Sequence, residues 1–378
     1  MHLTLHLTTA CNMRCDYCYA PPHPGAAMTE PTALRALELG ARSTRGSCGV
    51  IFFGGEPLLH PGLIEATVQG ARAMQRKGVG AFHFKVTTNG LALDDRFLEL
   101  ALREDILVAM SFDGVEQAHN RHRKLAHGAD SFAQLLGRLK ALLEVRPYAS
   151  VLMVVSPDTA CWVADSVEFL LELGARYLIL SLDYAARWTE PLLEELRCGY
   201  ERLARLYVQW TRAGRKFYLS PFEVKLASHI QGRDFVRDRC ELGTRQISVA
   251  PDGSLFPCVQ FTRAGARSSW CIGHVDAGVD ERAKAEIAKV ANRPKQPCSG
   301  CAIEARCNHT CGCLNWQATG DVQQVSAVLC RHEQMLVPIV DRVGTELYRE
   351  RNGLFLRKHY DPAFPLLSLL EEQTGPRS

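Results

Sequence analysis

Short apolar runs alternate with longer segments of helical period along the first half of the chain. Six of these runs predict buried strands, at residues 3–9, 50–55, 82–90, 106–114, 150–156 and 177–182. The segments between them place apolar residues three or four positions apart. In the first of these segments, Thr29 suits a helix N-cap and Pro31 the first turn. Strands that alternate with helices predict an α/β fold with a parallel sheet, either open or closed into a barrel.

The pattern changes after residue 189. Residues 189–213 predict a long helix rich in Leu, Glu and Arg, and residues 331–350 predict another helix. A bridge and a cysteine-rich segment lie between these two helices. We therefore divide the chain into a barrel domain (1–189), a helical bridge (190–239), a cysteine-rich domain (240–335) and a C-terminal helix and tail (336–378).

Polar residues and glycines follow most of the predicted strands. They are Gly54, Gly55 and Glu56, then Thr88, Asn89 and Gly90, then Ser111, Asp113 and Gly114, and finally Ser156 and Asp183. A single glycine at a strand end is usually only a turn former. However, the carboxyl ends of parallel strands meet at one edge of the sheet, where such proteins hold their ligands. The recurrence of polar residues therefore predicts a functional site at that edge.

Composition narrows the range of functions. Of the 378 residues, 47% are apolar and 22% charged, and the net charge is +3. Acidic and basic residues are mixed, so no basic stripe favours a nucleic-acid partner. No apolar run reaches the roughly eighteen residues of a membrane span, and the first residues do not have the pattern of a signal peptide. We therefore expect a cytoplasmic protein without a membrane or nucleic-acid partner.

The cysteine content is high for such a protein. Disulfides are rare in the cytosol, so the fifteen cysteines more often act there as metal ligands or catalysts. Cys48, Cys161 and Cys198 are isolated along the chain, and we expect them to be small buried apolar residues. The others lie close to the N-terminus or between residues 240 and 330.

The N-terminal group forms the pattern CxxxCxxC, with Cys11, Cys15 and Cys18 in the loop after the first strand. A structural zinc site usually completes four ligands, but these three cysteines have no fourth ligand nearby in sequence. Three thiolates on a four-iron cluster would leave one iron open to a small molecule, as a reactive cluster needs.

This motif, with Tyr17 before its last cysteine, resembles that of the radical S-adenosylmethionine (radical SAM) enzymes. The segment "FFGGEP" is similar to the GGEP segment of the same family. The resemblance implies a partial (β/α)6 barrel of the TIM type and a [4Fe-4S] cluster whose open iron binds S-adenosylmethionine. It also implies cofactor-binding roles for Tyr17 and for Gly54, Gly55, Glu56 and Pro57, with Glu56 as an acceptor for the methionine amino group.

The segment "SFDG" and the residues after it also resemble the fourth strand of that family and its following segment. Ser111 and Arg123 are therefore candidates for ribose or carboxylate contacts. The family chemistry starts with one electron, from a donor such as flavodoxin or ferredoxin, and yields a 5′-deoxyadenosyl radical that abstracts hydrogen. The protein must exclude water and direct this radical at one C–H bond.

The cysteines between residues 240 and 330 form a second pattern. Cys240 and Cys258 flank "VAPDGSLF", a predicted hairpin in which Pro251 and Gly253 suit the turn. The remaining members are spaced CxxC-x5-C-x3-C, with one more cysteine eighteen residues later. The whole pattern is similar to the SPASM extension of radical SAM enzymes that act on peptides. A structural zinc module is the alternative interpretation.

The SPASM resemblance implies two auxiliary [4Fe-4S] clusters, which makes three clusters in all. The first would take Cys240, Cys258 and Cys311. The second would take Cys298, Cys301, Cys307 and Cys330. The first cluster then has only three assigned ligands, and Cys271, Cys313 or an open iron could complete it.

The resemblance favours a maturase of ribosomally made peptides, most simply one that forms crosslinks. The alternatives are formylglycine-type protein oxidation, small-molecule dehydrogenation, or a non-catalytic iron–sulfur or zinc scaffold. Sulfatase-maturing members have an aspartate base after the equivalent of Cys258, whereas this chain has Val259, which cannot take a proton.

Two further expectations concern the substrate. Only ten residues precede Cys11, whereas many peptide maturases carry a leader-binding domain there. We therefore expect either a separate leader-binding protein or direct binding of the peptide. Asp183 follows the sixth strand and is a candidate catalytic base or peptide-binding group, although a solvated loop is the more ordinary interpretation of its segment.

Overall fold

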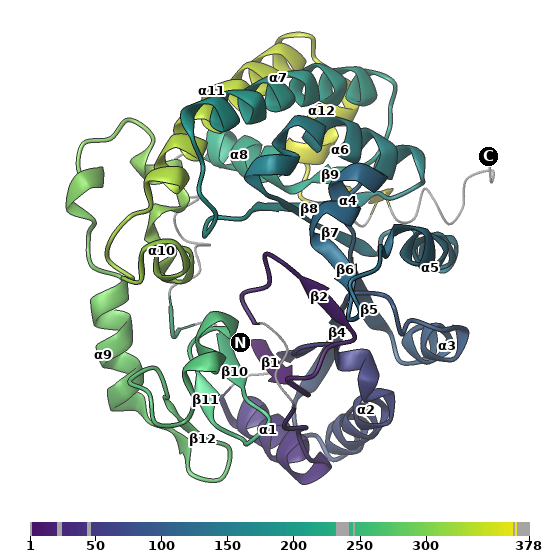
Figure 1. The fold of residues 1–378 in the computed structure, drawn as a ribbon, viewed down its shortest axis with the longest axis vertical. Helices are drawn as coiled ribbons and strands as arrows, with labels where there is room; N and C mark the ends of the chain where they lie inside the picture. Colours follow the sequence, from purple (N-terminus) through teal and green to yellow (C-terminus); the bar gives the residue numbers. More distant parts are fainter. Residues whose placement is uncertain are drawn as a thin grey trace.

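The computed structural model describes residues 2–20, 25–43, 47–231, 242–244, 246–365 and 367–368. All six predicted strands are present: β1 (His2–His6), β3 (Ser47–Phe53), β4 (Ala81–Thr88), β5 (Ile106–Ser111), β7 (Ser150–Val155) and β8 (Tyr177–Leu182). They lie side by side in this order and pair in parallel, with β9 (Tyr218–Leu219) after β8. The predicted parallel α/β sheet is confirmed. It curves into a partial barrel with helices on its outer side (Figure 1).

The outer layer consists of the helices that connect successive strands. These are α1 (Glu30–Ser43), α2 (Pro61–Arg76), α3 (Asp95–Arg103), α5 (Phe132–Val145) and α6 (Val163–Glu172). Local sequence explains their boundaries and orientation. At the start of α3, the side chain of Asp94 accepts a hydrogen bond from Phe97 N at 2.8 Å and caps the helix. Phe97, Leu98 and Ala101 then bury one face of α3.

The sheet continues beyond the predicted domain boundary at residue 240. Strand β10 (Gln246–Val249) pairs in parallel with β1, at the edge opposite β9, and β11 (Leu255–Phe256) pairs antiparallel with β10. The predicted hairpin is confirmed, and Ala250 N donates to Ser254 O at 2.9 Å across its turn. The cysteine-rich region therefore begins with strands that extend the barrel sheet.

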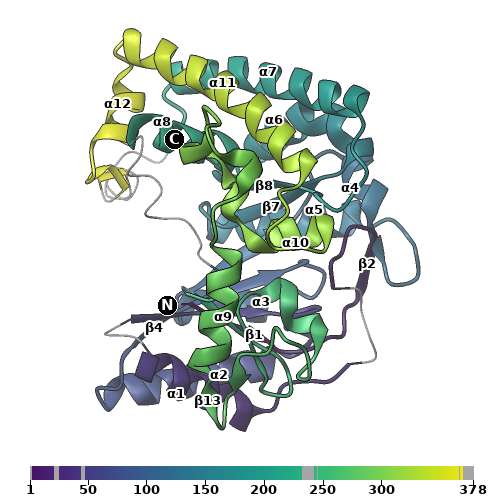
Figure 2. The ribbon, with the colours of Figure 1, turned by 90° about the vertical axis from the view of Figure 1, so that its left-hand side faces the viewer.

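The rest of the cysteine-rich region spans the open side of the barrel. It contains β12 (Gly273–His274), β13 (Gly278–Val279), α9 (Glu281–Ala291) and α10 (Gly312–Thr319). Figure 2 shows α9 and α10 between the side of the molecule that carries α1 and the side that carries α7 (Glu190–Arg212). Both edges of the curved sheet are therefore linked by C-terminal segments.

The two long helices expected from the sequence are α7 and α11 (Ala327–Arg349), and they pack against each other beside α8 (Ser220–Gln231) and α12 (Gly353–Tyr360). The predicted boundary between residues 335 and 336 falls inside α11. A buried ion pair joins α8 to α11, with Lys225 Nζ 2.5 Å from Glu333 Oε2. Burial of a charge requires such a partner.

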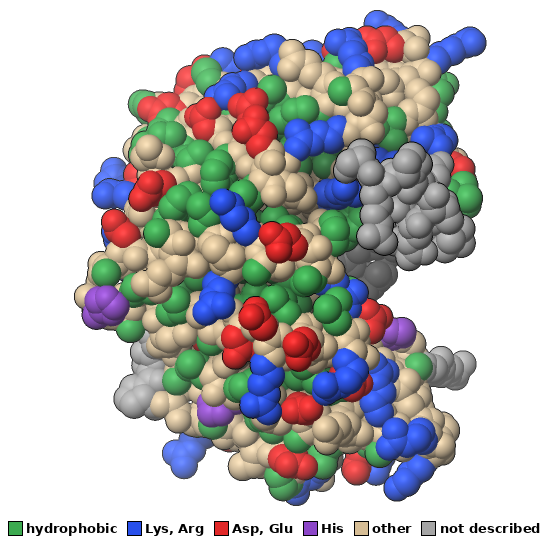
Figure 3. Space-filling view, turned by 90° about the vertical axis from the view of Figure 1, so that its right-hand side faces the viewer, with side chains coloured by type: hydrophobic (Ala, Val, Ile, Leu, Met, Phe, Trp, Pro, Cys, Tyr) green, Lys and Arg blue, Asp and Glu red, His purple; other side chains and the backbone are tan. Residues whose placement is uncertain are grey.

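The surface agrees with the mixed charge of the sequence. On the face drawn in Figure 3, lysine and arginine side chains alternate with aspartate and glutamate. Among the described residues, no helix combines the length and the apolar content needed to cross a membrane.

Candidate active site

The three N-terminal cysteines line one cavity at the carboxyl ends of the parallel strands. Its volume is about 360 Å³. Cys11, Cys15 and Cys18 are half-buried and lie close enough to interact electrostatically. The loop that carries them forms a short strand, β2 (Met13–Cys15), which pairs antiparallel with β6 (Arg123–Leu125) and sets Cys15 opposite Arg123. The fold therefore joins the cysteine motif to an arginine that is more than a hundred residues away in sequence.

Gly54 and Gly55 hold the cysteine loop by close backbone contact. Gly55 N donates to Thr8 O at 2.8 Å. A Cβ on Gly54 would lie 2.4 Å from Thr8 O, and one on Gly55 would lie 2.1 Å from Ala10 O. Gly54 also has a φ of 135°, which disfavours any other residue. Both glycines line the cavity, so they shape its wall as well as the loop.

The carboxylate of Glu56 accepts hydrogen bonds from other groups of the protein. Its Oε1 accepts hydrogen bonds from Leu58 N at 2.9 Å and from Thr88 Oγ1 at 2.7 Å, and its Oε2 accepts one from Asn89 N at 2.7 Å. Burial raises its pKa, and these hydrogen bonds oppose the rise. Glu56 and Pro57 are buried and are not among the residues that line the cavity. The role of Glu56 towards a methionine amino group stays a prediction; what the structure shows is that it fixes the end of β4.

Asn89 was noted in the sequence only as a polar residue at a strand end, yet it contacts the cysteine loop directly. Its Nδ2 donates to Asn12 Oδ1 at 2.8 Å and lies 3.5 Å from Cys11 Sγ. It also lines the cavity. The sequence signal was its place after β4, but no spacing rule connects it to Cys11.

Arg123 is held in a buried polar network. Tyr17 Oη donates to Asp113 Oδ2 at 2.6 Å, and Arg123 Nη1 donates to Tyr17 Oη at 3.0 Å. Arg123 is 4% exposed, and its Nε and Nη2 have no hydrogen-bond partner among the described residues. Buried donors normally find an acceptor, and a guanidinium suits a carboxylate best. Since Arg123 lines the cavity, its two unfilled donors fit the carboxylate of a bound amino-acid group.

Ser111 and Asp183 complete the predicted set on the barrel side, and both line the same cavity. Asp183 Oδ1 accepts hydrogen bonds from Ala185 N and Ala186 N, each at 3.2 Å. Burial raises the pKa of Asp183, and the two backbone hydrogen bonds counteract this. Asp183 therefore keeps its proton to a higher pH than an exposed aspartate.

The cysteine-rich region closes the cavity on the other side. Gln260, Leu314 and Gln317 line it together with Tyr19. An adjoining outer pocket of about 500 Å³ shares six lining residues with the cavity, so Asp183 stands at their junction. The six are Tyr17, Cys18, Tyr19, Asp183, Gln260 and Gln317. Sequence reasoning missed these glutamines because no motif marks them.

The C-terminal cysteines form two groups. Cys258 and Cys311 both contact Cys313, and these shared hydrogen bonds lower the pKa values of Cys258 and Cys311 and raise that of Cys313. Cys298 interacts electrostatically with Cys301, Cys307 and Cys330. Cys240 lies outside the described residues. Ligation of iron by either group stays a prediction.

The described cysteines are all free of disulfide bonds. Among the residues that the structure describes, no three His, Cys, Asp or Glu side chains converge on the position of a single metal ion. A four-iron cluster is wider than one ion, because each of its irons takes a separate thiolate. The half-buried triad around an open cavity is compatible with such a cluster.

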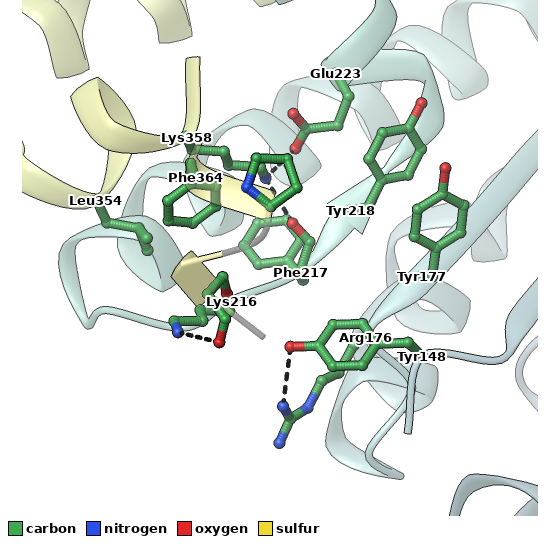
Figure 4. A pocket seen from close by; sticks show the side chains of 12 residues that line it. Tyr148, Arg176, Tyr177, Lys216, Phe217, Tyr218, Glu223, Leu354, Lys358 and Phe364 are labelled. Carbon is green, nitrogen blue, oxygen red and sulfur yellow. Dashed lines mark hydrogen bonds and ion pairs between the residues drawn. The ribbon is translucent and has the colours of Figure 1, made fainter. Parts of the chain in front are cut away.

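A second pocket lies at the opposite end of the sheet (Figure 4). Its volume is about 460 Å³, and Tyr177 and Tyr218, the first residues of β8 and β9, stack in its wall with ring centres 4.2 Å apart. The ammonium group of Lys358 pairs with Glu223 and donates to Phe217 O at 2.5 Å. Lys358 and Glu223 in this pocket are thus paired with each other.

Comparison with known proteins supports the interpretation of the cysteine loop and of the barrel. Residues 5–170 match the family model of the radical SAM superfamily. These residues therefore form a radical SAM domain. The match runs from the end of β1 through β7 and covers every predicted cofactor-binding residue of the barrel, together with the triad.

Relatives of this radical SAM enzyme include maturases. The serine-type anaerobic sulfatase-maturating enzyme of Klebsiella aerogenes is 26% identical over 336 residues, which are 80% of this chain and 77% of the relative. The sporulation killing factor maturation protein SkfB of Bacillus subtilis is 25% identical over 261 residues, 68% of this chain and 59% of SkfB. In structure, anSMEcpe with bound AdoMet matches with a TM-score of 0.78 at 18% identity, over 92% of this chain and 99% of anSMEcpe. The same fold therefore extends through the cysteine-rich region.

Proposed function

We propose that this chain is a radical SAM maturase that modifies a peptide and forms a crosslink within it. The observation that carries the proposal is the position of Asp183 at the junction of the cysteine-lined cavity and the outer pocket. A peptide in the outer pocket would meet the radical at this junction. An acidic side chain there can take the proton that the peptide loses when the new bond forms, and the electron released in the same step would pass to an auxiliary iron–sulfur cluster as the one-electron oxidant.

The residues around the cavity fit the cofactors of the family. Cys11, Cys15 and Cys18 would bind three irons of a [4Fe-4S] cluster, and Arg123 Nε and Nη2 would bind the carboxylate of S-adenosylmethionine. When bound, the cluster and S-adenosylmethionine supply a 5′-deoxyadenosyl radical, which abstracts a hydrogen atom from the peptide. Ser111 lies on the same wall and is a candidate for the ribose contact.

The protein would orient the bound cofactor and exclude water from the cavity. Tyr17 and Asp113 hold the guanidinium of Arg123 in place, so the bound carboxylate would have one position. Leu314, Gln260 and Gln317 cover the cavity from the cysteine-rich region, which limits the access of water. We expect flavodoxin or ferredoxin as the electron donor, and a separate leader-binding protein wherever the peptide does not bind directly.

Formylglycine-type oxidation is the second candidate function. The observation in its favour is the similarity to sulfatase-maturating enzymes over 80% of this chain. Against it, Val259 follows Cys258 and does not line the described cavity, so this position offers no base. Asp183 would then have to serve as the base for this reaction too.

The test is anaerobic reconstitution with iron and sulfide, followed by reaction with candidate precursor peptides under a reductant. A crosslink removes two hydrogen atoms and suppresses backbone fragmentation within the new ring in tandem mass spectrometry. Formylglycine instead gives an aldehyde that reacts with a hydrazide probe. A cluster-loaded protein that forms no 5′-deoxyadenosine from S-adenosylmethionine would contradict both functions.

A further inference from the structure

Three polar side chains connect the loop that carries Asp183 to the two long helices, α7 and α11. Tyr184 follows Asp183 in the loop after β8, Tyr200 lies in α7, and His332 lies in α11. His332 Nδ1 is 3.0 Å from Tyr184 Oη, and His332 Nε2 is 3.0 Å from Tyr200 Oη. One imidazole ring therefore joins the active-site loop to a helix pair that packs outside the barrel.

The three side chains are buried together. Tyr184 is 8% exposed, His332 6% and Tyr200 0%. A neutral imidazole has one N–H donor and one acceptor nitrogen, so in either tautomer one tyrosine hydroxyl donates to the ring and the other accepts from it. Buried polar groups are costly without partners, and these three groups satisfy one another. The position of the Tyr184 hydroxyl is therefore set by α7 and α11, outside its own loop.

The other contacts of this loop also converge on Asp183. Its backbone N–H donates to Val155 O at 2.9 Å, at the end of the neighbouring strand β7. Trp188 Nε1 donates to Asp183 O at 2.8 Å, from the end of the same loop. These contacts hold the loop to itself and to the sheet, while the hydrogen bond between Tyr184 and His332 adds an attachment to the helices.

The order of the two residues gives this attachment a consequence for the site. Tyr184 extends towards the helices, whereas Asp183, the residue before it, lines both the cavity and the outer pocket. A single peptide unit separates them, so a change in the backbone at Tyr184 moves the Asp183 carboxylate. Proton transfer requires hydrogen-bond reach, and a displacement of about 1 Å is enough to slow a reaction strongly.

We propose that His332, acting through Tyr184, is a positioning residue that holds Asp183 at the junction of the cavity and the outer pocket. This inference rests on the proposed function, in which Asp183 takes the proton from the peptide. His332 and Tyr184 touch neither pocket among the described lining residues, so they act on the peptide only through Asp183.

The chain offers a matched pair of variants for the test. Tyr184→Phe and Tyr200→Phe each remove one buried hydroxyl from the same imidazole ring, but only Tyr184 adjoins Asp183. Hydrogen exchange of the full chain, followed by mass spectrometry, reports on the backbone of residues 183–186. We expect exchange there to become about tenfold faster in Tyr184→Phe and to stay unchanged in Tyr200→Phe.

The same pair separates positioning from a general loss of stability in the reconstituted enzyme. We expect Tyr184→Phe to lower the yield of modified peptide per 5′-deoxyadenosine about tenfold and to leave 5′-deoxyadenosine formation per folded chain unchanged. Tyr200→Phe should keep the yield. Urea denaturation should show similar losses of stability in both variants, because each removes one buried hydrogen bond to the same ring.

Variants of His332 complete the test. His332→Phe keeps an aromatic ring without hydrogen-bonding atoms and should lower the yield as Tyr184→Phe does. His332→Gln keeps one donor group and one acceptor, so it should restore part of the yield.

Equal exchange of residues 183–186 in the two tyrosine variants would overturn the proposal, and so would an unchanged yield in Tyr184→Phe. If exchange changes only in Tyr184→Phe while the unsubstituted chain modifies no peptide, His332 holds the loop as proposed and the proposed function fails instead.

Discussion

The two ends of the same parallel sheet carry pockets of similar size and different chemistry. The pocket at the amino ends of β8 and β9 has a volume of about 460 Å³, and the ammonium of Lys358 is paired there with Glu223. The cavity at the carboxyl ends has about 360 Å³ and contains three half-buried thiols and an arginine with two buried donors that lack a described partner. Unsatisfied polar groups, rather than volume, therefore distinguish the candidate active site.

The comparison has a physical basis in how parallel strands end. Loops at the carboxyl ends carry the polar residues Asn89, Asp113 and Asp183, whereas the amino ends of β8 and β9 begin with stacked tyrosines. In α/β barrels, the carboxyl face usually carries function and the amino face usually contributes stability. Variants at the two ends should therefore separate activity from stability.

The largest expected effect comes from loss of the triad. Replacing Cys11, Cys15 and Cys18 by alanine should abolish 5′-deoxyadenosine formation and remove about four irons per chain, because no other thiols line the described cavity. The measurement is product chromatography with iron analysis after anaerobic reconstitution. The matched control is Cys161→Ala. The expectation that Cys161 is buried is wrong, because the structure places it on the surface and outside both pockets. Persistent cleavage in the triple variant would show that the site is elsewhere.

Arg123→Ala should have the next largest effect. It would remove the two proposed charge-assisted hydrogen bonds to the cofactor carboxylate, and we expect S-adenosylmethionine to bind about tenfold to a hundredfold more weakly. Equilibrium dialysis with the cluster-loaded protein measures this change.

Arg123→Lys is the matched control for that variant. Lysine keeps the charge beside Asp113 but lacks the planar fork of donors, so its affinity should fall between those of the arginine and alanine proteins. Equal binding in all three would show that the carboxylate lies elsewhere.

Asp183→Asn should separate radical formation from peptide modification. Without a base, 5′-deoxyadenosine should still form while modified peptide falls about a hundredfold. Because burial raises the pKa of Asp183, the unsubstituted protein should lose modified peptide as the pH falls through that raised value, since protonation removes the base. The yield of product per 5′-deoxyadenosine, measured against pH, checks this. An identical acidic limb in Asp183→Asn would exclude Asp183 as the titrating group.

The smallest effect on activity should come from the opposite pocket. Phe217 is buried there beside Tyr207, with ring centres 5.0 Å apart. Phe217→Ala should lower the free energy of unfolding by about 3 kcal/mol and leave 5′-deoxyadenosine formation per folded chain unchanged. Urea denaturation measures the first effect and an activity assay at low temperature the second. Loss of cofactor cleavage in the folded variant would contradict the division between the two ends.

The sequence by itself determined the order of strands and the identity of the cysteines. Apolar periodicity located all six strands, because the face of the sheet that packs against the helices is buried and needs apolar residues at alternate positions. The motif around Cys11, Cys15 and Cys18 was readable because its spacing is local. The glycines at positions 54 and 55 were also visible, but their contact with the backbone of Thr8 and Ala10 was not.

Only the tertiary structure decided which distant groups meet. Pairing of β2 with β6 brings Arg123 to Cys15, and Asn89 at the end of β4 reaches Asn12 in the cysteine loop. The structure also shows that the carboxylate of Glu56 accepts hydrogen bonds from Thr88 Oγ1 and Asn89 N. Such contacts depend on strand register, helix packing and side-chain direction, which are set by the whole core. Local sequence patterns fix what a segment can form, and burial of the complete chain fixes what it touches.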